Sequence, residues 1–393
     1  MKPQACEVTI LMPCLNEAET LGKCIQDAKL GLANAAVTGE ILVADNGSTD
    51  RSAAIAEANG ARVVHVAEKG YGSALRGGIK EAKGRWIIMG DADGSYDFSN
   101  ISGFIARLRE GHDLVMGCRL PAGGGRIMPG AMPWKNRWIG NPVLSFLGRA
   151  FFKSSSRDWH CGLRAFQKPA IEGLDLQTTG MEFASEMVIK AVLKSLRIAE
   201  VPIILYPDGR SRSPHLRPWR DGWRHLRFML IYSPRWLFLV PGLLLASLGF
   251  IAAAVLSIGP VRIGNIQLDV GTLVEACMLV IVGVQLVAFA YFTKVFAIAR
   301  GLLPADPKFS RLFSTLTLER GIAAGLLFCL VGLGLFARAL WMWEQTGYGE
   351  IPYPDNLRRL VPSAAWIIVG IQIIFSSFFI SVLGLRTVHR RPQ

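Results

Sequence analysis

The second half of the chain contains four apolar segments, each close to the length that a helix needs to cross a bilayer. They cover approximately residues 236–258, 272–298, 322–343 and 364–385. Because an irregular backbone cannot satisfy its polar groups in hydrocarbon, a spanning segment of this kind must be helical. The sequence therefore predicts an all-α transmembrane domain of four helices over residues 236–393.

Positive charge marks the side of the membrane on which each connecting loop lies. The segment between the second and third spans and the segment after the fourth hold the basic residues Arg300, Lys308, Arg311, Arg320, Arg386, Arg390 and Arg391. The other two connections are poor in Lys and Arg or are balanced by acids. Nothing near Met1 has the pattern of a signal peptide. We expect a multi-pass protein of the cytoplasmic (inner) membrane, with both termini and the soluble domain in the cytosol.

The net charge of +13 is concentrated just before the first span. Residues 119–235 contain 19 basic and 8 acidic side chains, whereas residues 1–118 contain 12 basic and 15 acidic ones. A basic surface beside a membrane domain suits anionic headgroups or an anionic lipid substrate. Nucleic acid is the other usual partner of basic proteins, but the sequence holds no recognisable nucleic-acid-binding module. We expect the lipid bilayer and an anionic lipid as partners, and no nucleic acid.

The first 235 residues alternate between short apolar segments and segments with helical periodicity. The expected strands are residues 8–13, 40–45, 61–66 and 86–89, and the expected helices between them are residues 20–31, 51–59 and 73–82. This order predicts an α/β, Rossmann-like, mostly parallel sheet with helices on both faces. Ligands of such sheets bind beyond the carboxyl ends of the strands. Acid-bearing turns at residues 13–17, 45–50 and 91–95 follow three of these strands and therefore define one candidate site.

Two carboxylates one residue apart end the fourth expected strand. In an extended chain, Asp91 and Asp93 point to the same side and can face one ligand together. Carboxylates that close repel each other unless a cation lies between them, and a hard ion such as Mg²⁺ or Mn²⁺ suits oxygen donors. An isolated D-x-D pattern is more often a solvated acidic turn. The two neighbouring acid-bearing turns favour a metal site here.

Five short motifs occur in a specific order and spacing over residues 7–235. They are M-P-C-L-N-E at 12–17, V-A-D-N-G-S-T-D at 43–50, K-G-Y-G-S-A-L-R-G-G at 69–78, G-D-A-D-G-S at 90–95 and C-G-L-R-A-F at 161–166. On these motifs the chain resembles glycosyltransferase family 2 enzymes with the GT-A fold. It is most similar to polyprenyl-phosphate and dolichyl-phosphate sugar synthases, of the dolichyl-phosphate mannose synthase type, with C-terminal transmembrane helices.

The resemblance implies a nucleotide site and a metal site at the acid-bearing turns. A basic cluster that includes Arg210 and Arg212 is placed to close over the diphosphate. The metal, Mg²⁺ or Mn²⁺, would be held by Asp91, Asp93 and Ser95. The remaining nucleotide-binding residues would be Pro13, Leu15, Asn16, Glu17, Asp45, Asn46, Lys69 and Ala92. The family often has tyrosine at the position of Leu15 and a second acid at that of Asn46, so the identity of the base stays open.

Basic residues in the second half of the soluble domain are candidates for binding an acceptor phosphate. Arg119 follows an expected strand, and Arg137 and Asn141 are four residues apart, so they share one helix face. By resemblance, these three residues would hold the phosphate of a lipid through charge-assisted hydrogen bonds. Alternatively, Arg137 has no role in binding the phosphate and is only a surface residue of an interfacial helix, together with Trp134 and Trp138.

By resemblance, the transferred sugar would be contacted from Gly162 and Arg164. Glu182 and Glu186 are four residues apart on one helix face, and one of them, with Glu182 as the candidate, would contact the sugar hydroxyls. The family usually has a small polar residue where this chain has His160. A solvated helix N-terminus favours acidic side chains, and this explains Glu182 equally well.

Three segments with different environments follow from these patterns. Residues 1–217 are expected to form the cytosolic GT-A domain, and residues 218–235 an amphipathic helix on the bilayer surface. Residues 236–393 form the transmembrane domain. Related enzymes have two or four spans, so the extra pair is a candidate surface for a homo-oligomer.

The expected reaction transfers a hexose from a nucleotide sugar, of the UDP-glucose or GDP-mannose type, to undecaprenyl or dolichyl phosphate. Asp93, Arg119 and Arg137 would act in catalysis through positioning and charge. Alternatives are a transferase for another lipid acceptor, a polysaccharide synthase, and a membrane-anchored scaffold with an inactive transferase domain. The segment Tyr232–Trp236 lacks the leading Gln or Arg of the synthase motif, which counts against a synthase.

Overall fold

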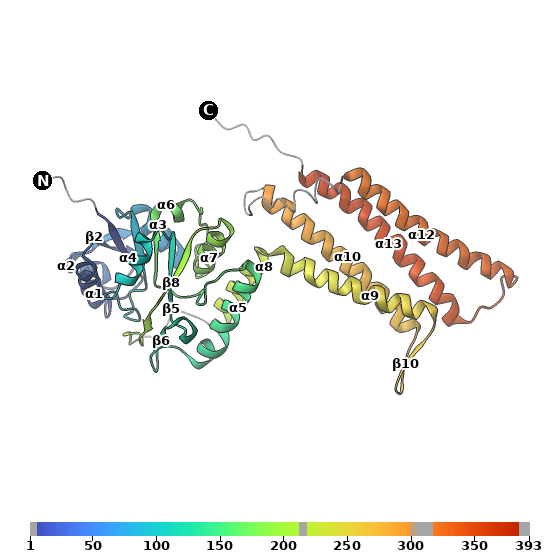
Figure 1. Cartoon of the computed structure of the whole chain (residues 1–393), viewed down its shortest axis with the longest axis horizontal. Helices are drawn as coiled ribbons and strands as arrows, with labels where there is room; N and C mark the ends of the chain where they lie inside the picture. Colours follow the sequence, from blue (N-terminus) through green and yellow to red (C-terminus); the bar gives the residue numbers. More distant parts are fainter. Residues whose placement is uncertain (1–5, 212–217, 300–302, 304–316, 385–393) are drawn as a thin grey trace, which may run out of the picture. The chain divides into compact units, whose positions relative to one another are not determined.

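The computed structural model describes residues 6–211, 218–299, 303 and 317–384 (Figure 1). The chain divides after Tyr232 into two compact units. The first unit contains the expected α/β domain together with the helix that follows it, and the second contains the apolar helices.

The N-terminal unit is built on a seven-stranded sheet that is parallel except for one strand. Its strands, in spatial order, are β3 (Arg62–His65), β2 (Gly39–Asp45), β1 (Val8–Cys14), β4 (Trp86–Met89), β7 (Arg164–Gln167), β5 (Leu114–Cys118) and β8 (Ile198–Pro202). Strand β7 runs antiparallel to both of its neighbours. The predicted mostly parallel sheet is confirmed, and it has the GT-A-like arrangement.

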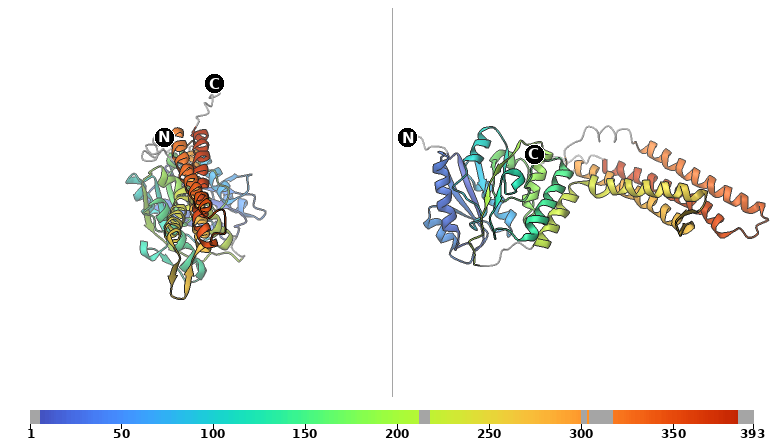
Figure 2. Two further views of the ribbon diagram at one scale, coloured as in Figure 1. Left: turned by 90° about the vertical axis from the view of Figure 1, so that its right-hand side faces the viewer. Right: turned by 60° about the horizontal axis from the view of Figure 1, so that its bottom comes forward.

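Helices cover both faces of this sheet, as Figure 2 shows. Successive residues of β1 point to opposite faces: Ile10 and Met12 belong to one buried cluster and Leu11 to the other. The first cluster includes residues of α1 (Leu21–Asn34), α2 (Ser52–Ala58) and α4 (Ser102–Arg109). The second includes residues of α3 (Tyr71–Glu81), α5 (Asn141–Phe152), α6 (Lys168–Glu172), α7 (Phe183–Leu193) and α8 (Pro218–Ile231). The layered fold inferred from alternation is thereby confirmed.

Residues 201–206 are divided between two sheets in the structure. Strand β8 ends at Pro202, and β9 (Ile204–Leu205) pairs with β6 (Arg126–Ile127) in a separate two-stranded sheet. Proline has no N–H to donate, so the ladder weakens where the chain leaves the main sheet. This change of sheet leads the chain back toward the D-x-D turn, where the backbone N–H of Gly209 donates to the carbonyl of Asp93 at 2.9 Å.

The C-terminal unit has four helices long and apolar enough to cross a membrane among the described residues. They are the π-helix η3 (Arg235–Leu239) continued by α9 (Val240–Ile258), then α10 (Val270–Ala299), α12 (Leu318–Gln345) and α13 (Tyr353–Gly384). The four predicted spans are thus all present. Helix α13 begins well before residue 364 and keeps Pro362 inside it.

Two features of this unit were not expected. A hairpin of β10 (Val261–Ile263) and β11 (Ile266–Leu268) connects α9 to α10. Glycines bring helix backbones into contact: a Cβ on Gly283 in α10 would lie 2.4 Å from the backbone nitrogen of Ala246 in α9. Helices α12 and α13 run side by side in the same way, with Gly332 against the carbonyl of Ser363 (Figure 1).

Candidate active site

The candidate site lies at the carboxyl ends of β1, β2 and β4, as the alternation predicts. The turn after β1 contains Glu17, β2 ends at Asp45, and the D-x-D pair follows β4. The hydroxyl of Thr20 donates to the carbonyl of Ala92 at 2.6 Å, which joins the first turn to the D-x-D turn. The three acid-bearing turns therefore form one continuous edge.

Asp45 is a buried carboxylate held by donors from its own turn. Its oxygens accept the backbone N–H groups of Gly47 and Ser48 and lie 3.1 Å from Nδ1 of His65. Burial raises the pKa of Asp45, but the hydrogen bonds from Ser48, His65 and Gly47 outweigh it and lower the pKa below the usual value. Asp45 is therefore ionised and is held in place by the donors of its own turn.

The two asparagines predicted to bind nucleotide are used in the structure to shape loops. Oδ1 of Asn16 accepts the backbone N–H of Thr49 at 2.7 Å, and Asn16 itself has a left-handed φ of 59°. Asn46 binds backbone groups of the segment after β3: its Nδ2 donates to the carbonyl of Glu68 at 2.7 Å, and its Oδ1 accepts the N–H of Gly70. Both amides position their loops in this structure, and their predicted nucleotide contacts stay predictions.

The other predicted base and phosphate contacts differ in exposure. Leu15 is exposed at the rim of the site, with 37% of its surface accessible, and Pro13 is half-buried. The ammonium of Lys69 donates to the carbonyl of Asn46 at 2.9 Å. Arg212 lies outside the described residues.

The D-x-D carboxylates lie in a buried setting with different partners. Oδ1 of Asp91 accepts from the hydroxyl of Tyr71 at 3.0 Å, and burial together with the nearby charge of Asp93 raises the pKa of Asp91. Oδ1 of Asp93 accepts the N–H of Ser95 at 2.9 Å and its hydroxyl at 2.6 Å. The hydroxyl of Ser95 thus points toward the predicted metal ligand Asp93.

This donor set suits a hard divalent cation that also binds phosphate oxygens. Mg²⁺ is typically held by one or two carboxylates, with substrate phosphates and water as its other ligands. The described residues contain no group of three or more His, Cys, Asp or Glu side chains that could hold a metal without such a substrate. The repulsion that raises the pKa of Asp91 is the kind that a bound cation relieves.

Arg210 lies at the acidic edge, where it contacts two carboxylates, and its predicted contact with a diphosphate stays a prediction. Its Nη2 donates to Oδ2 of Asp93 at 2.6 Å and its Nη1 to Oε1 of Glu17 at 3.1 Å. Asp208 is the third carboxylate nearby, 3.4 Å from Nε. The guanidinium thus neutralises Asp93 and Glu17, which are predicted to bind the metal and the nucleotide.

Arg119 forms a buried bidentate ion pair with Asp158, a contact that the sequence did not predict. Nε and Nη2 of Arg119 both donate to the carboxylate of Asp158 at 2.7 Å, and the backbone N–H of Arg119 donates to it at 3.0 Å. Arg119 has only 7% of its surface accessible. Its side chain is oriented at the base of the site, and its direct contact with a lipid phosphate stays a prediction.

Arg137 and Asn141 lie at the junction of the π-helix η2 (Asn136–Gly140) with α5. Nδ2 of Asn141 is 3.2 Å from the sulfur of Met132, and the Arg137 guanidinium lies 5.3 Å from the ring of Trp138. A cavity of about 440 Å³ opens beside this junction. Its lining combines apolar side chains with three arginines. The lining residues are Leu120, Pro121, Ala122, Ile127, Arg137, Trp138, Pro142, Ser145, Arg149, Ser155 and Arg157.

Two of the predicted sugar-side residues are structural in this chain. Arg164 has no exposed surface and donates to the backbone carbonyls of Trp159, Cys161 and Ala184. It fixes the turn before β7, so the structure does not support its predicted contact with a sugar. Gly162 is packed against the D-x-D: a Cβ there would lie 2.8 Å from Oδ2 of Asp91.

Glu182, the third predicted sugar contact, precedes α7. Its Oε2 is buried and has no hydrogen-bond partner among the described residues. The alternative explanation from the sequence was an acidic side chain solvated at a helix N-terminus. Because this oxygen is buried, that explanation does not hold for it.

Sequence reasoning missed three residues that support this site. Tyr71 binds Asp91, and Asp158 orients Arg119. The hydroxyl of Tyr96 accepts the N–H of Gly162 at 2.9 Å. Tyr71 and Asp158 fall within or beside the quoted motifs, but no local pattern tells which distant group each one meets.

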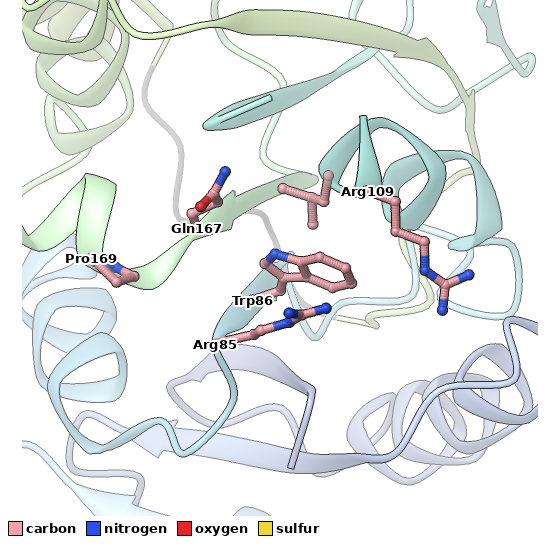
Figure 3. Close-up of a pocket in the computed structure, with 6 residues that line it drawn as sticks. Arg85, Trp86, Arg109, Gln167 and Pro169 are labelled. Carbon is pink, nitrogen blue, oxygen red and sulfur yellow. The ribbon is translucent and has the colours of Figure 1, made fainter. Parts of the chain in front are cut away.

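A second cavity, of about 370 Å³, lies at the opposite edge of the sheet (Figure 3). Arg85 precedes β4, and Gln167 ends the antiparallel β7, so both lie at the edge remote from Asp91. The indole of Trp86 lies between the labelled side chains of Arg85 and Gln167 in Figure 3. The guanidinium of Arg85 lies over the Trp86 ring, with Cζ 4.0 Å from the ring centroid, and its Nη2 forms an ion pair with Oε1 of Glu7 at 2.9 Å. No predicted site residue lines this cavity.

Comparisons with known proteins match both units. The family model described as "Glycosyl transferase family 2" matches residues 9–173, and the model described as "Glycosyltransferase family 2 C-terminal transmembrane region" matches residues 291–384. A relative from Haloferax volcanii, the low-salt glycan biosynthesis hexosyltransferase Agl6, is 36% identical over 379 residues, covering 96% of this chain and 89% of the relative.

Two further matches are restricted to the N-terminal half. The dolichyl-phosphate hexose transferase of Haloferax volcanii is 27% identical over 198 residues, which are 50% of this chain and 82% of that protein. Among solved structures, glucosyl-3-phosphoglycerate synthase from Mycobacterium tuberculosis, in complex with Mn²⁺ and UDP-glucose, is 20% identical with a TM-score of 0.45, covering 58% of this chain and 79% of that one.

Proposed function

Because this chain belongs to glycosyltransferase family 2, we propose that it transfers a hexose from a nucleotide sugar to the phosphate of a membrane polyprenol. The donor would be of the UDP-glucose or GDP-mannose type, and the acceptor undecaprenyl or dolichyl phosphate. The products are a polyprenyl-phosphate sugar and a nucleoside diphosphate. Transfer would be inverting, as the family resemblance implies.

The observation that carries the choice of acceptor is the cavity beside η2 and α5. Its arginines, Arg137, Arg149 and Arg157, suit an anionic headgroup, and its apolar lining suits the start of a hydrocarbon chain. Trp138 in this lining and Trp134, four residues earlier, are 61% and 65% exposed, which suits residues that rest at a membrane surface. An acceptor that is both anionic and lipidic accounts for both properties. The name of the Haloferax volcanii dolichyl-phosphate hexose transferase points in the same direction.

The donor is assigned to the acidic edge. Asp45 and Glu17 would hold the ribose and base, and Asp91 and Asp93 a divalent cation, Mg²⁺ or Mn²⁺, together with the diphosphate. That cation would supply positive charge to the leaving diphosphate. Arg210 would exchange its carboxylate partners for phosphate oxygens when the donor binds.

The chemistry requires little acid–base help from the protein. A phosphate monoester is already mostly ionised near neutral pH, with a second pKa of about 6. The residues therefore act by holding the donor and acceptor in line and by excluding water. Arg137 would orient the attacking phosphate, and Arg119 would add positive charge from beneath, in the position fixed by Asp158.

We place this reaction on the cytosolic face of the cytoplasmic membrane. The basic loop and tail around the apolar helices support that orientation. It also brings a cytosolic nucleotide sugar to a domain whose chain continues into four candidate spans.

The test is a product assay with the full chain in lipid nanodiscs. Purified protein is supplied with Mn²⁺, undecaprenyl phosphate and, one at a time, UDP-glucose and GDP-mannose, and both free nucleoside diphosphate and glycolipid are measured. Glycolipid with one donor supports the proposal and names the sugar. Release of nucleoside diphosphate without glycolipid would overturn the polyprenyl phosphate acceptor. Transfer to diacylglycerol in place of the phosphate lipid would identify a neutral acceptor and overturn it too.

A further inference from the structure

Two histidines and a serine from three separate segments meet beside the active site. His160 lies in the turn before β7, Ser185 in the first turn of α7, and His225 in α8. The Ser185 hydroxyl is 2.8 Å from Nδ1 of His225 and 3.5 Å from Nε2 of His160, so it can donate to one ring and accept from the other. The two rings form an edge-to-face pair with centroids 4.7 Å apart.

The turn that contains His160 touches the proposed catalytic groups on both of its sides. Two residues before His160, Asp158 binds the Arg119 fork; two residues after it, Gly162 packs against Oδ2 of Asp91. The side chain of His160 connects this turn to Ser185 of α7 and His225 of α8. Arg164 provides a second link to α7, because it donates to carbonyls of the turn and to that of Ala184. A shift of the turn would therefore move the partner of Arg119 and the wall beside Asp91 together.

Helix α8 provides a firm attachment for the other end of this contact. Met229 of α8 has no exposed surface and belongs to the buried cluster on one face of the sheet. Phe228 stacks on Tyr232 with centroids 4.7 Å apart. On the same helix, Trp219 and Trp223 are 84% and 58% exposed. His225, at 7% exposure, is therefore held on a helix with one side in the core and aromatic residues on its outside.

We propose that Ser185 and His225 are positioning residues, which act through His160 to hold the turn of residues 158–162 where Arg119 and Asp91 can engage the substrates. The contact makes the geometry of the active site depend on the docking of α8. If the exposed tryptophans of α8 rest on the bilayer, the acceptor side of the site is assembled most completely at the membrane.

Simple packing explains the cluster less well. Nδ1 of His160 is buried and has no hydrogen-bond partner among the described residues, and such a group costs stability compared with an apolar side chain. Burial, followed by His225 and Arg119, lowers the pKa of His160 well below its usual range, so the ring is neutral and offers one donor and one acceptor. The neutral imidazole of His160 lowers stability but faces the Ser185 hydroxyl and the His225 ring. This arrangement fits a residue that orients its turn.

The first test needs no substrate and uses amide hydrogen exchange on the full chain in nanodiscs. The N–H of Gly162, which donates to Tyr96, reports on the turn. Ser185→Ala and His225→Leu should each speed exchange in residues 158–162 by about fivefold or more, the effect of losing one hydrogen bond. Exchange in β2, remote from the cluster, should not change. Unchanged exchange at Gly162 in both variants would overturn the proposal.

Two further variants separate positioning from loss of packing. His225→Asn keeps a polar group near Nδ1 and should restore most of the protection that His225→Leu removes. His112→Ala, whose ring lies 3.0 Å from the carbonyl of Arg107 and outside the cluster, should leave exchange in residues 158–162 at the level of the unaltered chain. If the Asn and Leu variants exchange equally fast, the hydrogen bond does not hold the turn.

A kinetic test rests on the proposed function, whereas the exchange test does not. With the donor and undecaprenyl phosphate of the product assay, Ser185→Ala should raise the KM for the lipid phosphate by about fivefold and the KM for the nucleotide sugar by less. The smaller effect on the donor is expected because only Asp91 of its proposed ligands borders this turn, whereas Asp45 and Glu17 are held by other segments. An equal rise in both KM values would contradict a role in placing Arg119. Absence of any turnover in the unaltered chain would count against the proposed function alone.

Discussion

Asp93 and Asp97 form the same small turn, yet of the two only Asp93 lies at the candidate site. In each case Oδ1 accepts the N–H and the hydroxyl of the serine two residues on, with N–H distances of 2.9 Å. What distinguishes Asp93 is its surroundings: Arg210 binds its second oxygen, and Glu17 shares that arginine. At the scale of single residues, function here depends on the neighbours that the fold supplies and not on local geometry.

This pair offers a matched test of the metal site. Asp93→Asn should remove binding of Mn²⁺ in the presence of nucleoside diphosphate and abolish turnover, because a neutral amide is a poor ligand for a hard cation. Asp97→Asn changes the same turn at a remote position and should retain both. Titration calorimetry with Mn²⁺ and UDP or GDP measures the binding. Undiminished Mn²⁺ affinity in the Asp93 variant would remove that residue from the metal site.

The sequence predicted the acids better than it predicted the amides and guanidinium groups. Carboxylates at strand ends gather at one edge of a parallel sheet by topology, so Asp45, Asp91 and Asp93 could be grouped. Asn46 and Arg164 carry donors that serve a backbone loop as readily as a ligand, and only the three-dimensional partners decide between the two. Arg164 satisfies two carbonyls of its own turn and that of the distant Ala184, which no spacing rule reveals.

At the scale of elements, a buried carboxylate of α7 binds the loop that precedes this helix. Glu186 has 1% of its surface exposed and accepts from the N–H groups of Gln177 and Thr178, from the Thr178 hydroxyl at 2.6 Å and from Lys190 at 2.7 Å. Burial raises its pKa, but Lys190, Thr178 and Gln177 outweigh burial, and the net effect lowers the pKa below the ordinary value of 4.5. The folded state therefore favours the ionised form.

This direction determines how stability should depend on pH. As pH falls below about 4.5, the unfolded chain takes up a proton at this position before the folded chain does, so the stabilisation is lost. Glu186→Gln should cost about 2 kcal/mol at pH 7, with a difference from the unaltered chain that shrinks as pH falls through that range. Thermal unfolding monitored across pH measures it. Glu172→Gln, at an exposed i,i+4 pair with Lys168, should change little at any pH. A Glu186 effect that does not vary with pH would refute the electrostatic explanation.

Contacts between α9 and α10 depend on glycine. A side chain at Gly283 would meet the backbone of Ala246 at 2.4 Å, whereas one at Gly334 in α12 would meet nothing within 4 Å. Gly283→Leu should therefore destabilise the C-terminal unit by about 1–3 kcal/mol, and Gly334→Leu should be tolerated. The measurement is the temperature at which each variant loses its monodisperse peak on size-exclusion chromatography in detergent. Equal behaviour of the two variants would show that this helix contact contributes little.

Element boundaries and strand direction were the limits of prediction at this scale. The four strands β1 to β4 and the four apolar helices were located because hydrophobic period and length are local properties. Strand β7 was not, because its antiparallel insertion between β4 and β5 is decided by long-range pairing. The strands of the β10–β11 hairpin were missed for a different reason, because three residues each are too few to show a period.

At the scale of the whole molecule, the sequence combines a nucleotide-binding type of domain with four candidate membrane spans. The proposed topology predicts that the β10–β11 hairpin faces away from the cytosol, opposite to the N-terminal unit. Asn265 is exposed at the tip of this hairpin, and Glu57 is exposed on α2.

In cells whose cytoplasmic membrane is intact, Asn265→Cys should react with a membrane-impermeant maleimide added outside. Any cell-envelope layers outside that membrane are first made permeable to the reagent. Glu57→Cys should react only after the cytoplasmic membrane is lysed, with the unaltered chain as background for its native cysteines. Labelling of the Glu57 variant in intact cells would reverse the proposed orientation.

The contacts of Arg210 have a consequence for any measurement of affinity. The acidic edge already has a counterion from its own chain, because one guanidinium binds both Asp93 and Glu17. A cation from solution must displace the Arg210 guanidinium from Asp93, so its binding free energy includes the cost of breaking that ion pair. A nucleoside diphosphate that binds with the metal offers the arginine new anionic partners and lowers this cost. Metal and nucleotide should therefore bind as a cooperative pair, each appearing weaker when measured alone.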